Sequence, residues 1–346
     1  MNRKKLLCMF ALIMAVCFTG IAGCGDSGDD AGENAAPAQE ETDAANNKKD
    51  AAKEDPSEKE KQKELEESMV NDGETDEAAA EEGYEVSGEG YTATVRWCKN
   101  GEKNIFGMLY VPEDYDGSKT YPTVIMSHGF GDCHTAYDAY APKMAAQGMV
   151  CYTFDFCTGT LKCLSDGEQT DYSVITETED LKAVMDFVKS QPCVDTSRIT
   201  MMGQSMGGLV TSLVAAERAD EIANVVLFYP GLMAPENLRE EYPTAADLPT
   251  EPAKFLGAEV GPVFFSDIYD LDVYGAIGNY TGPVLLLHGT ADKLVPVSVS
   301  EKALEVYENA ELKVIKGGNH GFPPLEDGTN VREIAYNYIM EFLENR

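Results

Sequence analysis

The sequence predicts an α/β fold with a mostly parallel sheet that is covered by helices on both faces. Apolar runs such as residues 122–127 and 283–288 alternate along the chain with helix-like stretches such as residues 173–190. Strands that are apolar throughout are buried on both faces, which is typical of parallel sheets. Residues 84–346 are numerous enough for one large domain of this kind.

Eight strands and five helices are expected in this domain. The expected strands are residues 91–97, 105–111, 122–127, 149–155, 198–203, 223–229, 283–288 and 311–316. The expected helices lie near residues 136–147, 173–190, 205–218, 298–309 and 329–345. Because strands and helices alternate, most neighbouring strands should be connected by crossover helices.

One insertion interrupts this alternation. About fifty residues, 231–282, separate the sixth expected strand from the seventh, and they are rich in Pro, Glu and aromatic residues. A loop of this length in a compact domain usually has a function. The aromatic side chains either pack a small core of the insertion or shape a binding surface, and the sequence leaves both interpretations open.

Ser205 is the candidate nucleophile. It is the central residue of Gly203-Gln204-Ser205-Met206-Gly207, which lies between an apolar run and a helix-like stretch. In a G-x-S-x-G turn between a strand and a helix, backbone strain raises the serine hydroxyl above the sheet edge. The amides at the start of the following helix favour negative charge on a substrate oxygen. The competing interpretation is a Gly/Ser turn that only ends a strand.

A serine of this kind needs a base, and an acid to orient the base. The four histidines of the chain are His128, His134, His288 and His320. After the G-x-S-x-G serine, the carboxylate and then the histidine follow along the chain. Asp292, directly after strand 283–288, and His320, in the loop 317–321, have this order. A turn-capping Asp292 and an exposed loop His320 are the alternatives.

The backbone amides of Phe130 and Met206 are the candidate oxyanion hole. Strand 122–127 continues into His128-Gly129-Phe130-Gly131, and Met206 follows the candidate nucleophile. An amide after an early strand and the amide after the nucleophile together stabilise the negative oxygen of an acyl-transfer intermediate. His128 is expected to brace this loop, although sequence order alone does not remove it as a base.

These motifs resemble the α/β-hydrolase superfamily, in particular bacterial cinnamoyl or feruloyl esterases and their dienelactone-hydrolase-like and peptidase-like relatives. The resemblance rests on residues 128–131, 203–207, 288–292 and 319–321, and covers roughly residues 100–346. It implies an eight-stranded α/β-hydrolase fold with Ser205 as nucleophile, His320 as general base and Asp292 as orienting acid. It also implies that the insertion after strand six is a cap over the site.

Two departures from the esterase branch put parts of this resemblance in doubt. Gln204 precedes the serine, where many esterases carry histidine. The insertion from Gly231 to Gly282 aligns with no motif of the branch. The second departure leaves substrate choice open.

The first 24 residues predict a lipoprotein signal peptide. A basic stretch, residues 2–5, precedes the apolar residues 6–20, which are too few for a comfortable membrane span. Ile21-Ala22-Gly23-Cys24 resembles a bacterial lipobox, in which the cysteine is acylated. An ordinary cleaved signal is the alternative. The expectation is an extracytoplasmic protein that is attached to the cell membrane through lipid on Cys24.

Residues 25–83 are expected to be a disordered acidic tether. This segment has no aromatic residue and contains 21 Asp and Glu against six Lys. Such a composition cannot bury enough apolar surface to offset the entropy of the chain. Its expected function is reach from the membrane, and a specific binding role is the alternative.

The formal net charge of −33 argues against nucleic acid as a partner, because an acidic surface repels polyphosphates. No phosphate-binding loop or metal-ligand cluster stands out, so neither a cofactor nor a metal is expected. Six cysteines lie outside the signal, at positions 98, 133, 151, 157, 163 and 193. Their even number permits disulfides, with Cys157–Cys163 as the first expected pair.

Three functions are compatible with these observations. The first is a serine esterase that acts on small-molecule carboxylic esters, for example hydroxycinnamate or acetyl esters. The second is a serine peptidase of the same fold, and the third is a non-catalytic binding lipoprotein, against which the complete triad argues. The sequence does not determine the acyl group, the alcohol or the oligomeric state.

Overall fold

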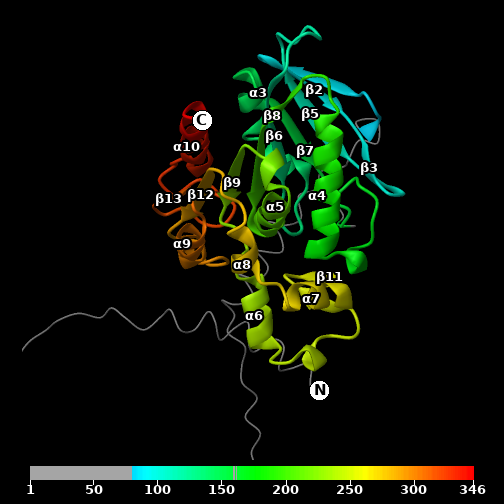
Figure 1. Ribbon diagram of the computed structural model, residues 1–346, viewed down its shortest axis with the longest axis vertical. Coiled ribbons are helices and arrows are strands. Elements are labelled where there is room, and N and C mark those ends of the chain that lie inside the picture. Colours follow the sequence, from blue (N-terminus) through cyan, green and yellow to red (C-terminus); the bar gives the residue numbers. More distant parts are fainter. Residues whose placement is uncertain (1–79, 159, 161) are drawn as a thin grey trace, which may run out of the picture. The chain divides into compact units, whose positions relative to one another are not determined.

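A computed structural model describes residues 80–158, 160 and 162–346 (Figure 1). The expected signal peptide, Cys24 and tether residues 25–79 lie outside the described residues. Within the described part of the chain, no helix combines the length and the apolar character that a membrane span requires.

The main sheet is mostly parallel, as predicted. Its strands, in spatial order, are β1 (Glu85–Gly88), β2 (Tyr91–Val95), β5 (Gly107–Pro112), β7 (Val150–Phe154), β6 (Tyr121–Ser127), β8 (Val194–Gln204), β9 (Asn224–Phe228), β12 (Val284–Gly289) and β13 (Ala310–Ile315). Neighbours from β7 to β13 pair in parallel, whereas β1, β2 and β5 form the antiparallel edge. The sheet therefore has nine strands, and the expected count of eight is wrong.

The strand that the sequence pattern missed is β1. Its first three residues are exposed, and it pairs with β2 across a tight turn in which Gly90 has a φ of 80°. A strand without a buried face has no alternation of apolar and polar residues, so the pattern gave no signal for it.

Helices cover both faces of the sheet, and two hydrophobic cores lie beneath them (Figure 1). The helices α4 (Val174–Lys189), α5 (Ser205–Glu217) and α9 (Val297–Val306) pack on one face, whereas α3 (Ala141–Ala146) and α10 (Val331–Glu344) pack on the other. Successive strand residues alternate between the cores: Leu285 and Leu287 belong to the second, and Leu286 to the first. This alternation explains why the central strands are apolar throughout.

The insertion between β9 and β12 has secondary structure of its own. It contains α6 (Ala234–Glu241), η5 (Ala245–Asp247), the hairpin β10 (Ala253–Phe255) and β11 (Ala258–Val260), α7 (Pro262–Tyr269) and α8 (Val273–Ile277). Figure 1 shows α6, α7 and β11 grouped at one end of the sheet. The remaining elements are the hairpin β3 (Cys98–Asn100) and β4 (Lys103–Ile105), and the 3-10 helices η2 (His134–Tyr137), η3 (Gln169–Asp171) and η4 (Ala219–Glu221).

The last residues of the expected tether belong to the folded unit. The indole nitrogen of Trp97 donates a hydrogen bond to the Ala80 carbonyl at 2.9 Å, and the Trp97 amide donates to the Glu82 carboxylate at 2.8 Å. The expected domain start at residue 84 is therefore a few residues too late. The acidic, alanine-rich composition of the expected tether gave no sign of this contact, because the partner is a single tryptophan further along the chain.

The expected Cys157–Cys163 disulfide is also wrong. All six cysteines of the described part are free thiols. The Cys163 sulfur accepts a hydrogen bond from Thr160 at 2.9 Å and donates to the Asp132 carbonyl at 3.3 Å, whereas the Cys157 sulfur faces the Asn104 carbonyl at 4.0 Å. The two thiols point to different neighbours, and the buried core stabilises the domain without them.

Candidate active site

Ser205 occupies a strained turn between β8 and α5. Its φ of 52° lies in the left-handed region, which non-glycine residues rarely adopt. A Cβ on Gly203 would lie 2.4 Å from the Thr211 hydroxyl, and a Cβ on Gly207 would lie 2.1 Å from the His128 carbonyl oxygen. Both glycines are therefore required by close contacts, and the turn raises the Ser205 hydroxyl above the end of the sheet.

The structure brings Ser205, His320 and Asp292 into one hydrogen-bonded chain. His320 Nε2 lies 3.0 Å from Ser205 Oγ, and His320 Nδ1 lies 2.8 Å from Asp292 Oδ2. With Nδ1 protonated and donating to the carboxylate, Nε2 accepts from the serine hydroxyl. This is the arrangement in which an imidazole can take the serine proton.

The Asp292 carboxylate is held by its own loop. Its side chain is completely buried, and Oδ1 accepts hydrogen bonds of 2.9 Å from the amides of Leu294 and Val295. These bonds leave Oδ2 for His320. Because the amides fix the carboxylate, its orientation does not depend on the presence of a substrate.

His288 supports this loop from the end of β12. Its Nε2–H donates to the Val295 carbonyl at 2.8 Å, so Nδ1 accepts from the Ser300 hydroxyl at 2.7 Å. Burial lowers the pKa of His288 and keeps the ring neutral. Although Nε2 lies 3.6 Å from Asp292, its proton is already committed to a carbonyl. His288 is therefore placed to position the loop that carries Asp292.

A link from Tyr229 to Asp132 passes beneath the site, and sequence reasoning missed it. The Tyr229 ring lies 4.4 Å from the His320 ring, and its hydroxyl donates to Gln204 Oε1 at 3.1 Å. Gln204 Nε2 in turn donates to Asp132 Oδ2 at 3.3 Å. Gln204, which departs from the esterase pattern, thus connects the strand before the nucleophile with the loop after β6. The one sequence feature that could have revealed this link is the aromatic residue Tyr229, directly after β9.

The loop after β6 lies directly against the nucleophile. A Cβ on Gly129 would lie 3.1 Å from the Ser205 Cβ. Among the described residues, the Phe130 amide has no hydrogen-bond acceptor, and Met206 stands in the first turn of α5, where amides lack an intrahelical acceptor. Both amides are thus available, and their role as the oxyanion hole stays a prediction.

His128 braces this loop with both ring nitrogens. Its Nδ1–H donates to the Gly129 carbonyl at 2.8 Å, and Nε2 accepts from the Phe156 amide at 3.0 Å. The ring is buried, and desolvation lowers its pKa. A neutral ring with no free nitrogen cannot serve as the base.

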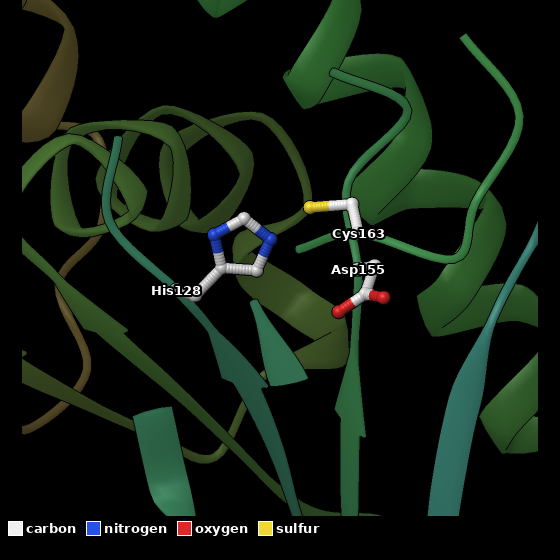
Figure 2. A group of neighbouring side chains, drawn as sticks. All are labelled: His128, Asp155 and Cys163. Atoms are coloured by element: carbon white, nitrogen blue, oxygen red, sulfur yellow. The ribbon is translucent and has the colours of Figure 1, made fainter. Parts of the chain in front are cut away.

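Two overlapping groups of side chains have the chemistry of metal ligands. His128, Asp155 and Cys163 converge at the ends of β6 and β7 (Figure 2), and Cys133 and His134 approach the same carboxylate. In each group of three, the ligand atoms lie within 4.8 Å of one another. The sequence gave no sign of this cluster, because its members come from two separate loops.

This chain is similar in sequence to several known proteins. Residues 118–258 match the model of a protein family described as "Serine aminopeptidase, S33". An uncharacterised 31.7 kDa protein of Escherichia coli is 33% identical over 99 residues, which is 28% of this chain. The chain covers 32% of the length of that relative.

Two further relatives have named activities. Cutinase est2 of Thermobifida alba is 25% identical over 213 residues, which cover 60% of this chain and 63% of the cutinase. Dipeptidyl-peptidase 5 of Porphyromonas gingivalis is 24% identical over 233 residues, which cover 63% of this chain and 32% of the peptidase. Both an esterase and a peptidase are thus similar to this chain.

Solved structures show the same fold. Est1E from Butyrivibrio proteoclasticus, solved with ferulic acid, has a TM-score of 0.64 at 24% identity, covering 72% of this chain and 99% of Est1E. Acetyl xylan esterase 1 from Thermoanaerobacterium sp. has a TM-score of 0.56 at 18% identity, covering 76% of this chain and 86% of that enzyme. At these identities the likeness concerns the fold alone.

Proposed function

We propose that this chain, which has the α/β-hydrolase fold, is an extracytoplasmic serine hydrolase that cleaves carboxylic esters. The observation that carries the proposal is the unbroken chain of hydrogen bonds from Asp292 through His320 to Ser205 at a strained turn. The comparisons support a hydrolase. We propose more specifically that the bond it cleaves is a carboxylic ester.

The proposed reaction proceeds through an acyl-enzyme. Ser205 Oγ attacks the ester carbonyl carbon while His320 Nε2 takes the hydroxyl proton, and the carbonyl oxygen becomes an oxyanion facing the amides of Phe130 and Met206. Collapse of this intermediate breaks the bond to the alcohol oxygen, which receives the proton from His320. Water then attacks the acyl carbon with His320 again as base. This second attack releases the acid and restores Ser205.

The aromatic residues of the insertion support two candidate substrates, an ester with an aromatic acyl group and an ester with a small acyl group. The ring of Phe130 contacts the rings of Phe255 and Phe264, at centroid distances of 5.1 and 6.1 Å. Phe264 in turn stacks on Tyr172 at 5.3 Å. The insertion thus packs against the residue whose amide would hold the oxyanion, as a cap that selects substrates would. Feruloyl and acetyl esters are the proposed test substrates.

A peptidase is the second candidate. The matching family is described as an aminopeptidase, and a dipeptidyl-peptidase is among the relatives. The same triad cleaves amides if the pocket binds a peptide N-terminus. Binding of a peptide N-terminus would need an acidic group other than Asp292, which is buried and committed to His320.

A substrate panel separates the two candidates. Purified protein is tested with p-nitrophenyl esters of graded acyl length, methyl ferulate and aminoacyl p-nitroanilides, with Ser205→Ala as the matched control. We expect turnover of esters that is lost in Ser205→Ala, together with fluorophosphonate labelling of the wild type only. Faster turnover of the anilides than of the esters would show that the protein is a peptidase rather than an esterase.

The membrane anchor is tested separately. We propose that acylated Cys24 attaches the protein to the outer face of the cell membrane, and the lipobox-like residues 21–24 support this. Metabolic labelling with a fatty acid should mark the wild type, and Cys24→Ala should lose the label and leave the membrane fraction. A wild-type protein without label would refute the anchor.

A further inference from the structure

The segment that carries Phe130 is attached at both ends to one short stretch of chain after β7. At its start, His128 accepts a hydrogen bond from the Phe156 amide at 3.0 Å. At its end, His134 donates to Asp155 through the backbone amide at 2.6 Å and through Nδ1 at 2.8 Å. We call residues 128–134 the oxyanion loop, since it contains the proposed oxyanion amide.

Asp155 is the fixed point of this attachment. Its side chain is completely buried. Besides the two bonds to Oδ1 from His134, Oδ2 accepts from the Leu164 amide at 2.7 Å. Its own carbonyl accepts from the Ser165 hydroxyl at 2.6 Å, and its own amide donates to the Phe106 carbonyl at 3.0 Å. A carboxylate with this many partners cannot move without breaking several hydrogen bonds.

These bonds favour a protein-only latch over a metal site. Figure 2 shows the His128 ring, the Asp155 carboxylate and the Cys163 sulfur close together. Both nitrogens of His128 and both oxygens of Asp155 already have protein partners, and Cys163 has Thr160 and Asp132. A metal ion would have to replace these bonds, and each buried group that loses its partner costs free energy.

The geometry points to His134 and Asp155 as positioning residues that hold the oxyanion loop at the distance from Ser205 at which the Phe130 amide acts in ester cleavage. This inference rests on the proposed function. Oxyanion donors act over a narrow range of about 2.7–3.1 Å, and a displacement of about 1 Å costs roughly a hundredfold in rate. Near its second end the loop also receives hydrogen bonds at Asp132 from Gln204 Nε2 and the Cys163 thiol, both at 3.3 Å, which are longer than the two bonds from His134 to Asp155.

The charge on His134 strengthens the latch. Burial lowers its pKa, but the hydrogen bond and charge of Asp155 outweigh burial, and the net pKa lies above the ordinary 6.5. The charges of Asp138 and Asp132 act in the same direction, and the uncharged Phe106 ring packs at 4.8 Å from the His134 ring. The imidazolium form therefore dominates in mildly acidic solution, and its contribution is lost as the pH rises through the raised pKa.

Three variants of the full chain test the latch. His134→Ala removes the side-chain donor, and kcat for p-nitrophenyl acetate should fall roughly ten- to a hundredfold with KM within about threefold. His134→Asn retains an N–H in the place of Nδ1, and kcat should recover to within about threefold of the wild type. Glu179→Gln, which removes an exposed charge that pairs with Lys182 on α4 and has no contact with the latch, should leave kcat unchanged.

The pH profile supplies a readout that a merely structural role would not move. When His134 loses one proton, its Nδ1–H bond to Asp155 remains but is no longer charge-assisted, so wild-type kcat should decline modestly on the alkaline side, and His134→Asn should lack that decline. Melting temperatures are measured in parallel for every variant. If His134→Ala proves to be unfolded, only the kinetics of His134→Asn are interpreted. An unchanged kcat in a folded His134→Ala, or the same alkaline decline in His134→Asn, would overturn the latch.

A metal assay completes the test. Protein purified without chelator should contain far less than one equivalent of zinc, and EDTA should leave kcat unchanged. If the wild type contained one equivalent of zinc and Cys133→Ser contained none, the cluster would be a metal site and the latch interpretation would be wrong. If the wild type neither cleaves esters nor reacts with a fluorophosphonate, the proposed function fails; if it does both and His134→Ala is fully active, only this inference fails.

Discussion

The nucleophile turn and the insertion hold their residues in different ways. Around Ser205 the constraints come from the backbone: glycine Cβ positions are filled by neighbouring main chain, and Asp292 is held by amides. In the insertion the contacts are between aromatic rings, such as Phe255 with Phe264 at 4.6 Å. Backbone constraints fix atoms to fractions of an ångström, whereas aromatic packing tolerates exchange of side chains. Chemistry should therefore be sensitive to small changes in the first region, and substrate choice should be adjustable in the second.

The largest effect is expected from removing the reacting groups. Ser205→Ala or His320→Ala should lower kcat by about four to six orders of magnitude with the fold intact, and the double variant should cost little more. Asp292→Asn should be less damaging than loss of the serine, because it misorients the base without removing it. Steady-state kinetics and circular dichroism check this. Retained fluorophosphonate labelling in Ser205→Ala would show that another residue is the nucleophile.

A methyl group added to the turn should have the next largest effect. Gly207→Ala should lower kcat more than about a hundredfold, because its Cβ would lie 2.1 Å from the His128 carbonyl and push the oxyanion loop away. Gly278→Ala, at the end of α8, is the matched control: its Cβ would meet a Val306 methyl at an ordinary 3.6 Å, and kcat should stay within about threefold. Equal activity of the two variants would contradict the backbone argument.

Changes in the insertion should act on KM. Phe255 is half-buried at the hairpin and contacts Phe130, so Phe255→Ala should raise KM for methyl ferulate about tenfold. Acetyl-ester kcat should remain within about twofold, because a small acyl group uses little of this surface. Initial-rate measurements over a range of ester concentrations decide the matter. A similar loss for both esters would mean that the insertion supports the reacting groups rather than substrate choice.

The smallest effect is expected at the opposite end of α5, remote from both regions. Arg218 contacts both carboxylate oxygens of Glu221 at 2.6 Å, and Lys189 also pairs with it. These partners lower the Glu221 pKa to about 2. The ion pairs therefore stabilise the domain above about pH 4.5, and this contribution is lost as the pH falls toward 2.

Glu221→Gln should consequently lower the melting temperature at pH 7 by roughly 2–4 °C, for about 1 kcal/mol after solvent screening, with kcat unchanged. Arg198, which pairs with Asp195 on the exposed surface, offers the control variant Arg198→Gln. The difference between Glu221→Gln and the wild type should shrink as the pH is lowered to 3. A constant difference over that range would mean that the side chain acts through packing rather than charge.

Much of the fold could be predicted because the buried strands and long helices have strong periodic patterns. The proximity of Ser205, Asp292 and His320 could be predicted because chain order and loop position are recorded in the sequence. The sequence did not reveal the Tyr229–Gln204–Asp132 link or the His134–Asp155 pair, since both join residues from separate loops. Short elements such as β1 and β10 were also missed, because three or four partly exposed residues carry no periodicity.

The free thiols have a practical consequence for anyone who handles this protein. Five of the six cysteines in the described domain are buried, and none is linked to another. Its stability should thus be indifferent to reductants: dithiothreitol should leave the melting curve unchanged, and the domain should fold in a reducing cytoplasm. A cysteine introduced at an exposed position could then be labelled selectively with a maleimide dye under native conditions.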